Sequence, residues 1–195
     1  GRIRRKLDEL KLADNTVIIF ASDNGGRVPT SSNLPLRVGK GSCYEGGTRV
    51  PFIVYWPKVT KPGSVCETPV ISMDMYPTLL EIVGEKSAAK KGVDGVSLVP
   101  LLKQNGKVKR DELFWHYPHY GNQGGSPGSA VRVGDWKFIE FFEEGRPPEL
   151  YDLKSDTGEK HNIYQQNMAK AKELKKMLDT WRTDVNANFP AKNPQ

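Results

Sequence analysis

The fold is decided by the stretch TVIIFASDNGG at residues 16–26, where an apolar run stops abruptly in polar residues and glycines. Residues 16–21 are rich in β-branched side chains and do not alternate with polar ones, which is typical of a strand buried on both faces of a parallel sheet. Before it, residues 2–12 place apolar side chains on one face at helical spacing. A helix followed by such a strand predicts an α/β fold, with the polar segment at the carboxyl end of the strand.

The α/β pattern continues through the first half of the chain. Residues 50–56 form a second apolar run of strand length. Residues 72–83 are expected to form a helix that Ser72 caps and Gly84 ends. The polar residues 86–106 are interpreted as the link to a second unit. The buried stripe of the helix is expected to comprise Met73, Tyr76, Leu79, Leu80 and Val83.

The last part of the chain predicts a small antiparallel sheet followed by a helix. The pair Gly134-Asp135 is a hairpin signal, and a helix from about residue 164 to residue 185 is expected to close the chain. We therefore expect two domains, with residues 1–106 in the α/β portion and residues 107–195 in a C-terminal subdomain. The four strands are expected at residues 111–116, 130–134, 136–142 and 149–153.

Composition and charge argue against several classes of function. Of the 195 residues, 37% are hydrophobic and 27% charged, as in soluble globular proteins, and no apolar run approaches the roughly 20 residues that span a bilayer. The net charge of +6 is scattered along the chain. Because the basic residues are not interleaved with stacking aromatics, the sequence argues against a nucleic-acid surface and stays compatible with an anionic polysaccharide. The first residues lack the apolar core of a signal peptide.

The chain has two cysteines, Cys43 and Cys66, which form neither a metal-binding spacing nor a disulfide framework. A disulfide between them would require the fold to bring them together, and the sequence leaves this open. We expect two free thiols that are mostly packed.

Two segments carry residue types that bind ions. Asp23 and Asn24 follow the predicted strand, and a carboxylate beside an amide carbonyl supplies hard oxygen ligands for Ca²⁺ or Mg²⁺. Lys40 stands between two glycines, where it can reach an anion as a mobile point charge. Taken by themselves, the two segments are also compatible with an ordinary turn and a solvated surface loop.

The ordered motifs resemble the type I sulfatase (arylsulfatase) family. The resemblance covers nearly the whole chain, in both order and spacing. The five motifs are SDNGG at residues 22–26, GKGSCYEGGTRVPF at 39–52, DMYPTLL at 74–80, SAVRVGDWKFI at 129–139, and ELYDL at 149–153 followed by Asp156, Glu159 and Asn162.

The resemblance implies the C-terminal part of an alkaline-phosphatase-like α/β sandwich, plus a small antiparallel β-sheet packed on a C-terminal helix. It implies a sulfuric-ester hydrolase in which Asp23 and Asn24 bind Ca²⁺ and Lys40 binds a sulfate oxygen. The family's nucleophile is a formylglycine made within a Cys/Ser-x-Pro-x-x-Arg-like motif, and no cysteine or serine of this chain fits that motif. We therefore expect the nucleophile in an N-terminal segment of the protein outside these residues, and we expect the isolated fragment to be inactive.

His116 and His119 are candidates for substrate contact. They stand among aromatic residues in FWHYPHY at 114–120, just before the glycine-rich residues 121–128. Sulfatases that resemble this chain present residues of this unit at the rim of the cleft, which suggests a sugar-binding role. The alternative is a strand end with packed aromatics and hydrogen-bonded histidines.

The expected substrate is a sulfated small molecule or carbohydrate, although the sequence does not name the ester. By resemblance, the expected compartment is periplasmic or secreted, or lysosomal in a eukaryote. Two alternative functions stay open. One is a phosphatase or phosphodiesterase relative on the same scaffold, and the other is a non-catalytic module that binds glycan or packs on its other part.

Overall fold

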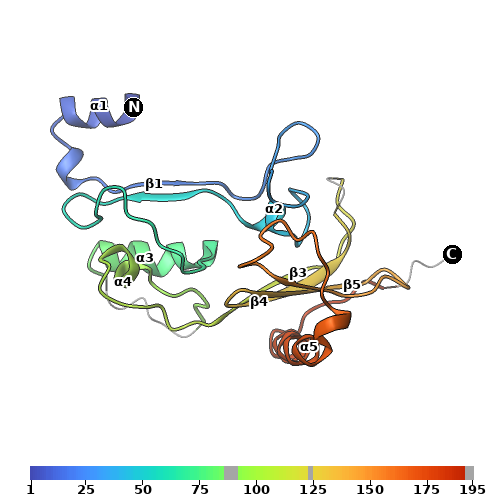
Figure 1. The fold of residues 1–195 in the computed structure, drawn as a ribbon. Helices are drawn as coiled ribbons and strands as arrows, with labels where there is room; N and C mark the ends of the chain where they lie inside the picture. Colours follow the sequence, from blue (N-terminus) through green and yellow to red (C-terminus); the bar gives the residue numbers. More distant parts are fainter. Residues whose placement is uncertain (86–91, 123–124, 192–195) are drawn as a thin grey trace. The chain divides into compact units, whose positions relative to one another are not determined.

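The computed structural model describes residues 1–85, 92–122 and 125–191 (Figure 1). The chain forms two compact units. The first comprises Gly1–Asp23 and Pro51–Arg110, and the second comprises Asn24–Val50 and Asp111–Gln195. The loop Asn24–Val50 therefore belongs to the same unit as the C-terminal sheet. Within the described residues, no helix has the length and apolar character to cross a bilayer.

The first unit contains a two-stranded antiparallel ribbon. Its strands β1 (Ile18–Ala21) and β2 (Phe52–Tyr55) pair along their whole length. The prediction of a parallel strand buried on both faces is wrong for this segment, because Phe20 is 60% exposed and Ile53 is 62% exposed. Burial of both faces needs an element packed on each of them. The other elements of this unit are α1 (Arg2–Glu9), η1 (Ala13–Asn15), η2 (Ser72–Asp74), α3 (Met75–Ile82) and α4 (Val99–Leu102).

Asp74, and not Ser72, organises the start of α3. The Asp74 carboxylate is fully buried and accepts the backbone N–H groups of Ile71 at 2.9 Å and of Val96 at 3.0 Å. Arg110 donates two charge-assisted hydrogen bonds to the same carboxylate, at 2.5 and 2.7 Å. The predicted cap at Ser72 is therefore wrong, because the buried carboxylate satisfies the backbone donors at this end.

The predicted apolar stripe along α3 is also wrong in its burial. The most buried residue of this helix is the polar Thr78, whose hydroxyl donates to the backbone oxygen of Asp74 at 2.6 Å and accepts the Leu98 N–H at 2.9 Å. The helix ends at Ile82, and Gly84, the residue predicted to stop it, follows the C-cap Val83 with a φ of +82°. Helical spacing gives α3 an apolar face without specifying what covers it. The stripe residues that are exposed by 45% or more are Met73, Tyr76, Leu79 and Val83.

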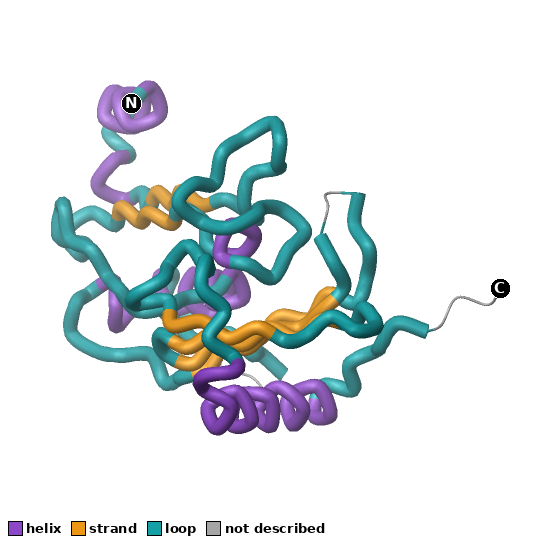
Figure 2. The backbone as a smooth tube through the Cα atoms, turned by 45° about the vertical axis from the view of Figure 1, so that its right-hand side comes forward, coloured by secondary structure: helices purple, strands orange, loops and turns teal. Residues whose placement is uncertain are grey.

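The second unit contains the predicted antiparallel sheet, which the structure confirms (Figures 1 and 2). Its strands follow the order β3-β4-β5-β6, each antiparallel to its neighbour. The hairpin at Gly134 is confirmed by a φ of +57° and by the pairing of Val133 with Trp136. The elements are α2 (Glu45–Thr48), β3 (Glu112–Tyr117), β4 (Gly128–Val133), β5 (Trp136–Phe141), β6 (Glu149–Asp152), η4 (Gln165–Asn167) and the predicted helix, α5 (Met168–Asp184).

Both faces of this sheet are covered (Figure 2). On one face, Leu174 of α5 belongs to the same buried cluster as Phe138 of β5. On the other face, Cys43 and Tyr44 pack in a cluster with Ile139. Because Phe138 and Ile139 are neighbours in one strand, their side chains point to opposite faces. The sheet therefore supports the loop that contains Lys40 on the face away from α5.

Both cysteines are free thiols, as predicted. Cys43 is buried against the sheet, which confirms its predicted packing. The packing predicted for Cys66 is wrong, because Cys66 lies exposed in the polar stretch that follows β2.

Candidate functional site

The loop around Lys40 is held by close packing between glycine backbones. We refer to residues 37–45 as the Lys40 loop. The Lys40 N–H donates to the Gly26 oxygen at 3.1 Å. A Cβ on Gly25 would lie 1.6 Å from the Gly46 oxygen, so only glycine permits this approach. The glycine pair of the SDNGG motif therefore runs directly against the Lys40 loop.

The side chain of Asn33 links the SDNGG motif to the Lys40 loop by hydrogen bonds. Its amide nitrogen donates to the Gly26 oxygen at 2.8 Å and to the Val38 oxygen at 3.0 Å, while its amide oxygen accepts the Gly26 N–H at 2.8 Å. One side chain thus satisfies backbone groups on both sides. Sequence reasoning missed Asn33, because an asparagine in a polar loop looks the same whether it fastens two segments or forms a local turn.

The Lys40 side chain is half-buried, and within the described part of the chain its ammonium makes no ion pair or hydrogen bond. A partly buried cation gains stability from a counter-charge, so an external anion is a suitable partner. The neighbouring Ser42 hydroxyl is already engaged, since it donates to the Gly39 oxygen at 2.8 Å. The sulfate-binding role of Lys40 stays a prediction that this geometry permits.

Asp23 and Asn24 lie where the chain passes from one unit to the other. Asp23 is exposed, whereas Asn24 is half-buried and donates its amide N–H to the Gly25 oxygen at 3.1 Å. Carboxylate and amide oxygens fit Ca²⁺ in chemical type, but two residues supply fewer than the about six to eight oxygens that Ca²⁺ takes. Among the described residues, no three His, Cys, Asp or Glu side chains are grouped to hold a metal ion. The pair thus fits as part of a calcium site.

A buried cluster of three charges, Glu45, Lys137 and Glu159, adjoins the end of the Lys40 loop. The Lys137 ammonium lies 2.9 Å from the Glu45 carboxylate and 3.1 Å from that of Glu159, which also accepts the Glu45 N–H at 2.7 Å. None of the three is more than 1% exposed. Burial raises the pKa of the Glu159 carboxyl, and Lys137 opposes this effect. The cluster has two carboxylates for one lysine. The guanidinium of Arg132, 3.5 Å from the Glu45 carboxylate, adds a second positive charge that balances them.

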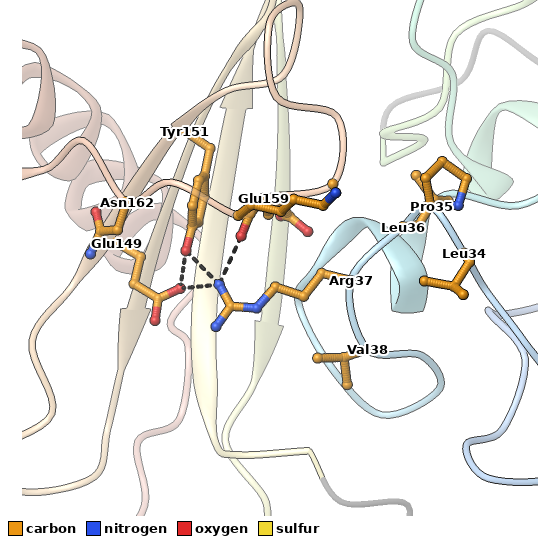
Figure 3. A pocket seen from close by; sticks show the side chains of 11 residues that line it. Leu34, Pro35, Leu36, Arg37, Val38, Glu149, Tyr151, Glu159 and Asn162 are labelled. Carbon is orange, nitrogen blue, oxygen red and sulfur yellow. Dashed lines mark hydrogen bonds and ion pairs between the residues drawn. The ribbon is translucent and has the colours of Figure 1, made fainter.

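Arg37, at the other end of the Lys40 loop, also reaches the C-terminal sheet (Figure 3). Its guanidinium donates to the Tyr151 hydroxyl at 2.6 Å and to the Glu159 backbone oxygen at 3.0 Å. The hydroxyls of Tyr151 and Tyr44 both donate to the Glu149 carboxylate, at 2.6 and 2.8 Å. Burial and the contact with Glu149 raise the pKa of both phenols, that of Tyr44 to about 12. At neutral pH these tyrosines therefore donate hydrogen bonds and do not serve as bases.

Arg37 and its partners Glu149, Tyr151 and Glu159 line one side of an open pocket of about 570 Å³ (Figure 3). Apolar side chains from the start of the Lys40 loop and the residues before it, among them Leu34 and Leu36, line the other side. Lys40 itself is not among the lining residues. The pocket is thus formed by the contact between the loop and the sheet, and it differs from the predicted sulfate site.

The two candidate histidines have different surroundings. His116 has both ring nitrogens engaged, Nδ1 with the Ser129 hydroxyl at 2.6 Å and Nε2 with the Asn188 oxygen at 2.7 Å. Its ring also packs edge-on against Phe142. His119 is exposed, and the centroid of its ring lies 5.5 Å from that of Tyr117, in an edge-on arrangement. The geometry of His116 matches the alternative of a packed, hydrogen-bonded imidazole, while substrate contact by either histidine stays a prediction.

Comparison with known proteins gives these features a family context. Residues 38–184 match the family model for the C-terminal region of N-sulphoglucosamine sulphohydrolase. A sulfatase from Formosa agariphila is 39% identical over 190 residues, which cover 90% of this chain and 34% of that protein. Arylsulfatase A from Homo sapiens is 34% identical over 188 residues, which cover 84% of this chain and 36% of that protein.

A solved structure, in complex with its substrate D-glucosamine-2-N,6-O-disulfate, is similar to the whole chain. The TM-score is 0.77 at 26% sequence identity, and the match covers 100% of this chain and 39% of that one. The chain spans about a third of the length of the curated relatives it matches.

Proposed function

The chain belongs to the sulfatase family, in the C-terminal region that the matched family model describes, and from that premise we propose that the protein containing it hydrolyses sulfate esters. The observation that carries the proposal is Lys40, a half-buried cation without an intramolecular partner in the described residues, held in a loop of tightly packed glycines. A sulfated carbohydrate is the proposed substrate class, supported by the relative solved with a sulfated glucosamine.

In this proposal, Lys40 holds a sulfate oxygen of the substrate. Its ammonium is a compact point charge that stabilises negative charge as it gathers on the sulfuryl oxygens and on the leaving oxygen. The loop fixes the backbone of Lys40, so little reorganisation is needed when the anion arrives. Lys40 thereby orients the ester and favours its transition state.

Asp23 and Asn24 are proposed to contribute oxygen ligands to Ca²⁺. When bound, the ion supplies further positive charge for the sulfuryl group. The remaining ligands, and a formylglycine nucleophile, would come from a segment of the protein outside these 195 residues. No cysteine or serine of this chain fits the motif for formylglycine formation, so we expect no turnover from the 195 residues by themselves.

We further propose that this outside segment, N-terminal to the chain, packs on the β1–β2 ribbon. The exposure of Phe20 and Ile53 supports this, because apolar side chains on a two-stranded ribbon gain stability when they are covered. A periplasmic, secreted or lysosomal location is proposed from the family alone.

The proposal is tested by the substitution Lys40→Ala in the full-length protein. With an aryl sulfate and sulfated monosaccharides as substrates, kcat should fall by about 100-fold or more, because one positive charge at the transition state is lost. Lys172→Ala, on the exposed face of α5, is the matched control and should leave kcat unchanged.

Three results would contradict the proposal. Near-wild-type turnover of Lys40→Ala would remove the role of Lys40. Hydrolysis of phosphate or phosphonate esters without sulfate esters would favour the phosphatase relative. Binding of sulfated glycan without any turnover of a full-length, formylglycine-containing protein would favour a non-catalytic module.

A further inference from the structure

Glu159 occupies an unusual position in the turn after β6. It is completely buried although it is charged, and its φ of +51° lies in the left-handed region that side-chain-bearing residues rarely adopt. Such a conformation persists where the surroundings hold it, and it is concentrated at functional positions. The contacts of Glu159 show what holds it and what it holds in turn.

Glu159 contacts both ends of the Lys40 loop. Its backbone oxygen accepts a hydrogen bond from the Arg37 guanidinium at 3.0 Å, three residues before Lys40. Its carboxylate accepts the Glu45 N–H at 2.7 Å, five residues after Lys40. The ammonium of Lys137, in β5, forms an ion pair with this carboxylate at 3.1 Å. Glu159, in the turn after β6, therefore clamps the two ends of the loop.

The loop is also closed on itself at this base. The Gly46 N–H donates to the Arg37 oxygen at 2.9 Å, so the residue directly after Glu45 is hydrogen-bonded to the other end of the loop. Movement of these two ends would shift the backbone between them, which includes Lys40. A misplacement of about 1 Å in a positioning group can cost about 100-fold in rate.

From this arrangement we infer that Glu159 is a positioning residue for Lys40, acting through Arg37 and Glu45 to fix the loop for sulfate binding. The inference rests on the proposed function of Lys40. It assigns to the turn after β6 a specific contribution to the reaction, in addition to its packing.

The test is a double-mutant cycle in the full-length protein, using Glu159→Gln and Lys40→Ala. Glutamine keeps an acceptor for the Glu45 N–H but loses the charge that Lys137 secures. We expect Glu159→Gln alone to lower kcat by about 10- to 100-fold. In the Lys40→Ala background it should lower kcat by less than about twofold, because it acts through a residue that is already absent.

A matched control is Glu140→Gln, which removes an ion pair with Arg182 and lies in β5, the strand that contains Lys137. It should change kcat by less than about threefold, by the same factor in both backgrounds. If Glu159→Gln also costs the same factor with and without Lys40, its effect is merely structural and the inference is overturned. Arg37→Met removes the other half of the clamp and should repeat the non-additivity if Glu159→Gln does not fold.

A second readout does not depend on turnover. Cys43 lies in the clamped loop and is buried, so its alkylation rate per thiolate, mapped by peptide mass spectrometry, reports opening of the loop. The fraction of thiolate is taken from the pH dependence of the rate in each variant, because the Glu159 charge itself contributes to the raised pKa of the Cys43 thiol. Glu159→Gln should raise this rate by about tenfold or more, without faster hydrogen exchange in α5, whereas Glu140→Gln should not. An unchanged Cys43 rate overturns the clamp. If the wild-type protein cleaves no sulfate ester, the proposed function fails, while the Cys43 rate still decides whether Glu159 holds the loop.

Discussion

Gly125 packs directly against the backbone oxygen of Gly41, the residue that follows Lys40. A Cβ built on Gly125 would lie 1.5 Å from that oxygen, far inside any van der Waals contact. The two glycines are 84 positions apart in the sequence. The Lys40 loop is therefore bounded by the chain segment before β4 as well as by its own neighbours.

We predict that Gly125→Ala displaces the Lys40 loop. The added methyl group meets backbone and not a flexible side chain, so we expect a loss of unfolding free energy of about 1–3 kcal/mol and a fall in kcat of about tenfold or more. Chemical denaturation and steady-state kinetics of the full-length protein measure both effects. Gly145→Ala is the control, because it introduces strain at a φ of +75° without any close contact. It should cost about 1 kcal/mol and leave kcat unchanged, and equal kinetic effects of the two variants would contradict the prediction.

The ion pair between Asp74 and Arg110 yields a prediction for stability. Asp74 is fully buried, and Arg110 is 14% exposed. Asp74→Asn removes one partner and leaves a nearly buried guanidinium uncompensated, so we expect a loss of about 3 kcal/mol in unfolding free energy at pH 7. Asp14→Asn serves as the control. Its pair with Lys58 is exposed, so it should change stability by less than about 1 kcal/mol, and a similar loss from both variants would show that burial does not matter here.

The same pair predicts a pH dependence. Burial alone would raise the pKa of Asp74, but the hydrogen bonds from Arg110 and from two backbone N–H groups outweigh it and hold the pKa below its ordinary value of 3.8. A lowered pKa in the folded state means that the contribution is fully present well above pH 3.8 and is lost as the pH falls below it. The difference in unfolding free energy between wild type and Asp74→Asn should therefore shrink from pH 7 to pH 3. A constant difference across this range would contradict the assignment.

The two cysteines should react very differently with iodoacetamide at pH 8. Burial raises the pKa of the Cys43 thiol to about 11, and the thiolate is the reactive form. Cys66 is exposed, so it should be alkylated at least about 100-fold faster. In denaturant both should react at similar rates. Rapid labelling of Cys43 in the folded wild-type protein would show that the Lys40 loop is not packed on the sheet.

The C-terminal sheet could be predicted from the sequence because its signals are local. A hairpin at Gly134 and short apolar segments on either side specify β4 and β5, and α5 follows from helical periodicity. The burial along β1 and α3 could not be predicted in the same way. Both segments have apolar faces, but what covers such a face depends on residues far away in the sequence or outside the chain.

The candidate site divides in the same manner. Lys40, Asp23 and Asn24 stand in short motifs that the sequence makes visible. Lys137 and Gly125 support the Lys40 loop from more than 80 positions away. Lys137 stands in the motif at residues 129–139, but nothing in that motif predicts its contact with Glu45, and Gly125 looks like an ordinary loop glycine. Long-range contacts of this kind become visible only when the backbone path is known.

Calcium binding gives the last prediction. If Asp23 contributes a charged ligand, Asp23→Asn should weaken Ca²⁺ binding by about tenfold or more, because affinity rises with the number of charged oxygen ligands. The measurement is the shift in melting temperature of the EDTA-treated, full-length protein as CaCl₂ is added, which does not require turnover. Asp14→Asn, an exposed aspartate in the same unit, should leave the titration unchanged. If Asp23→Asn and wild type titrate alike, Asp23 is not a ligand of Ca²⁺ and the proposed metal role of this residue is wrong.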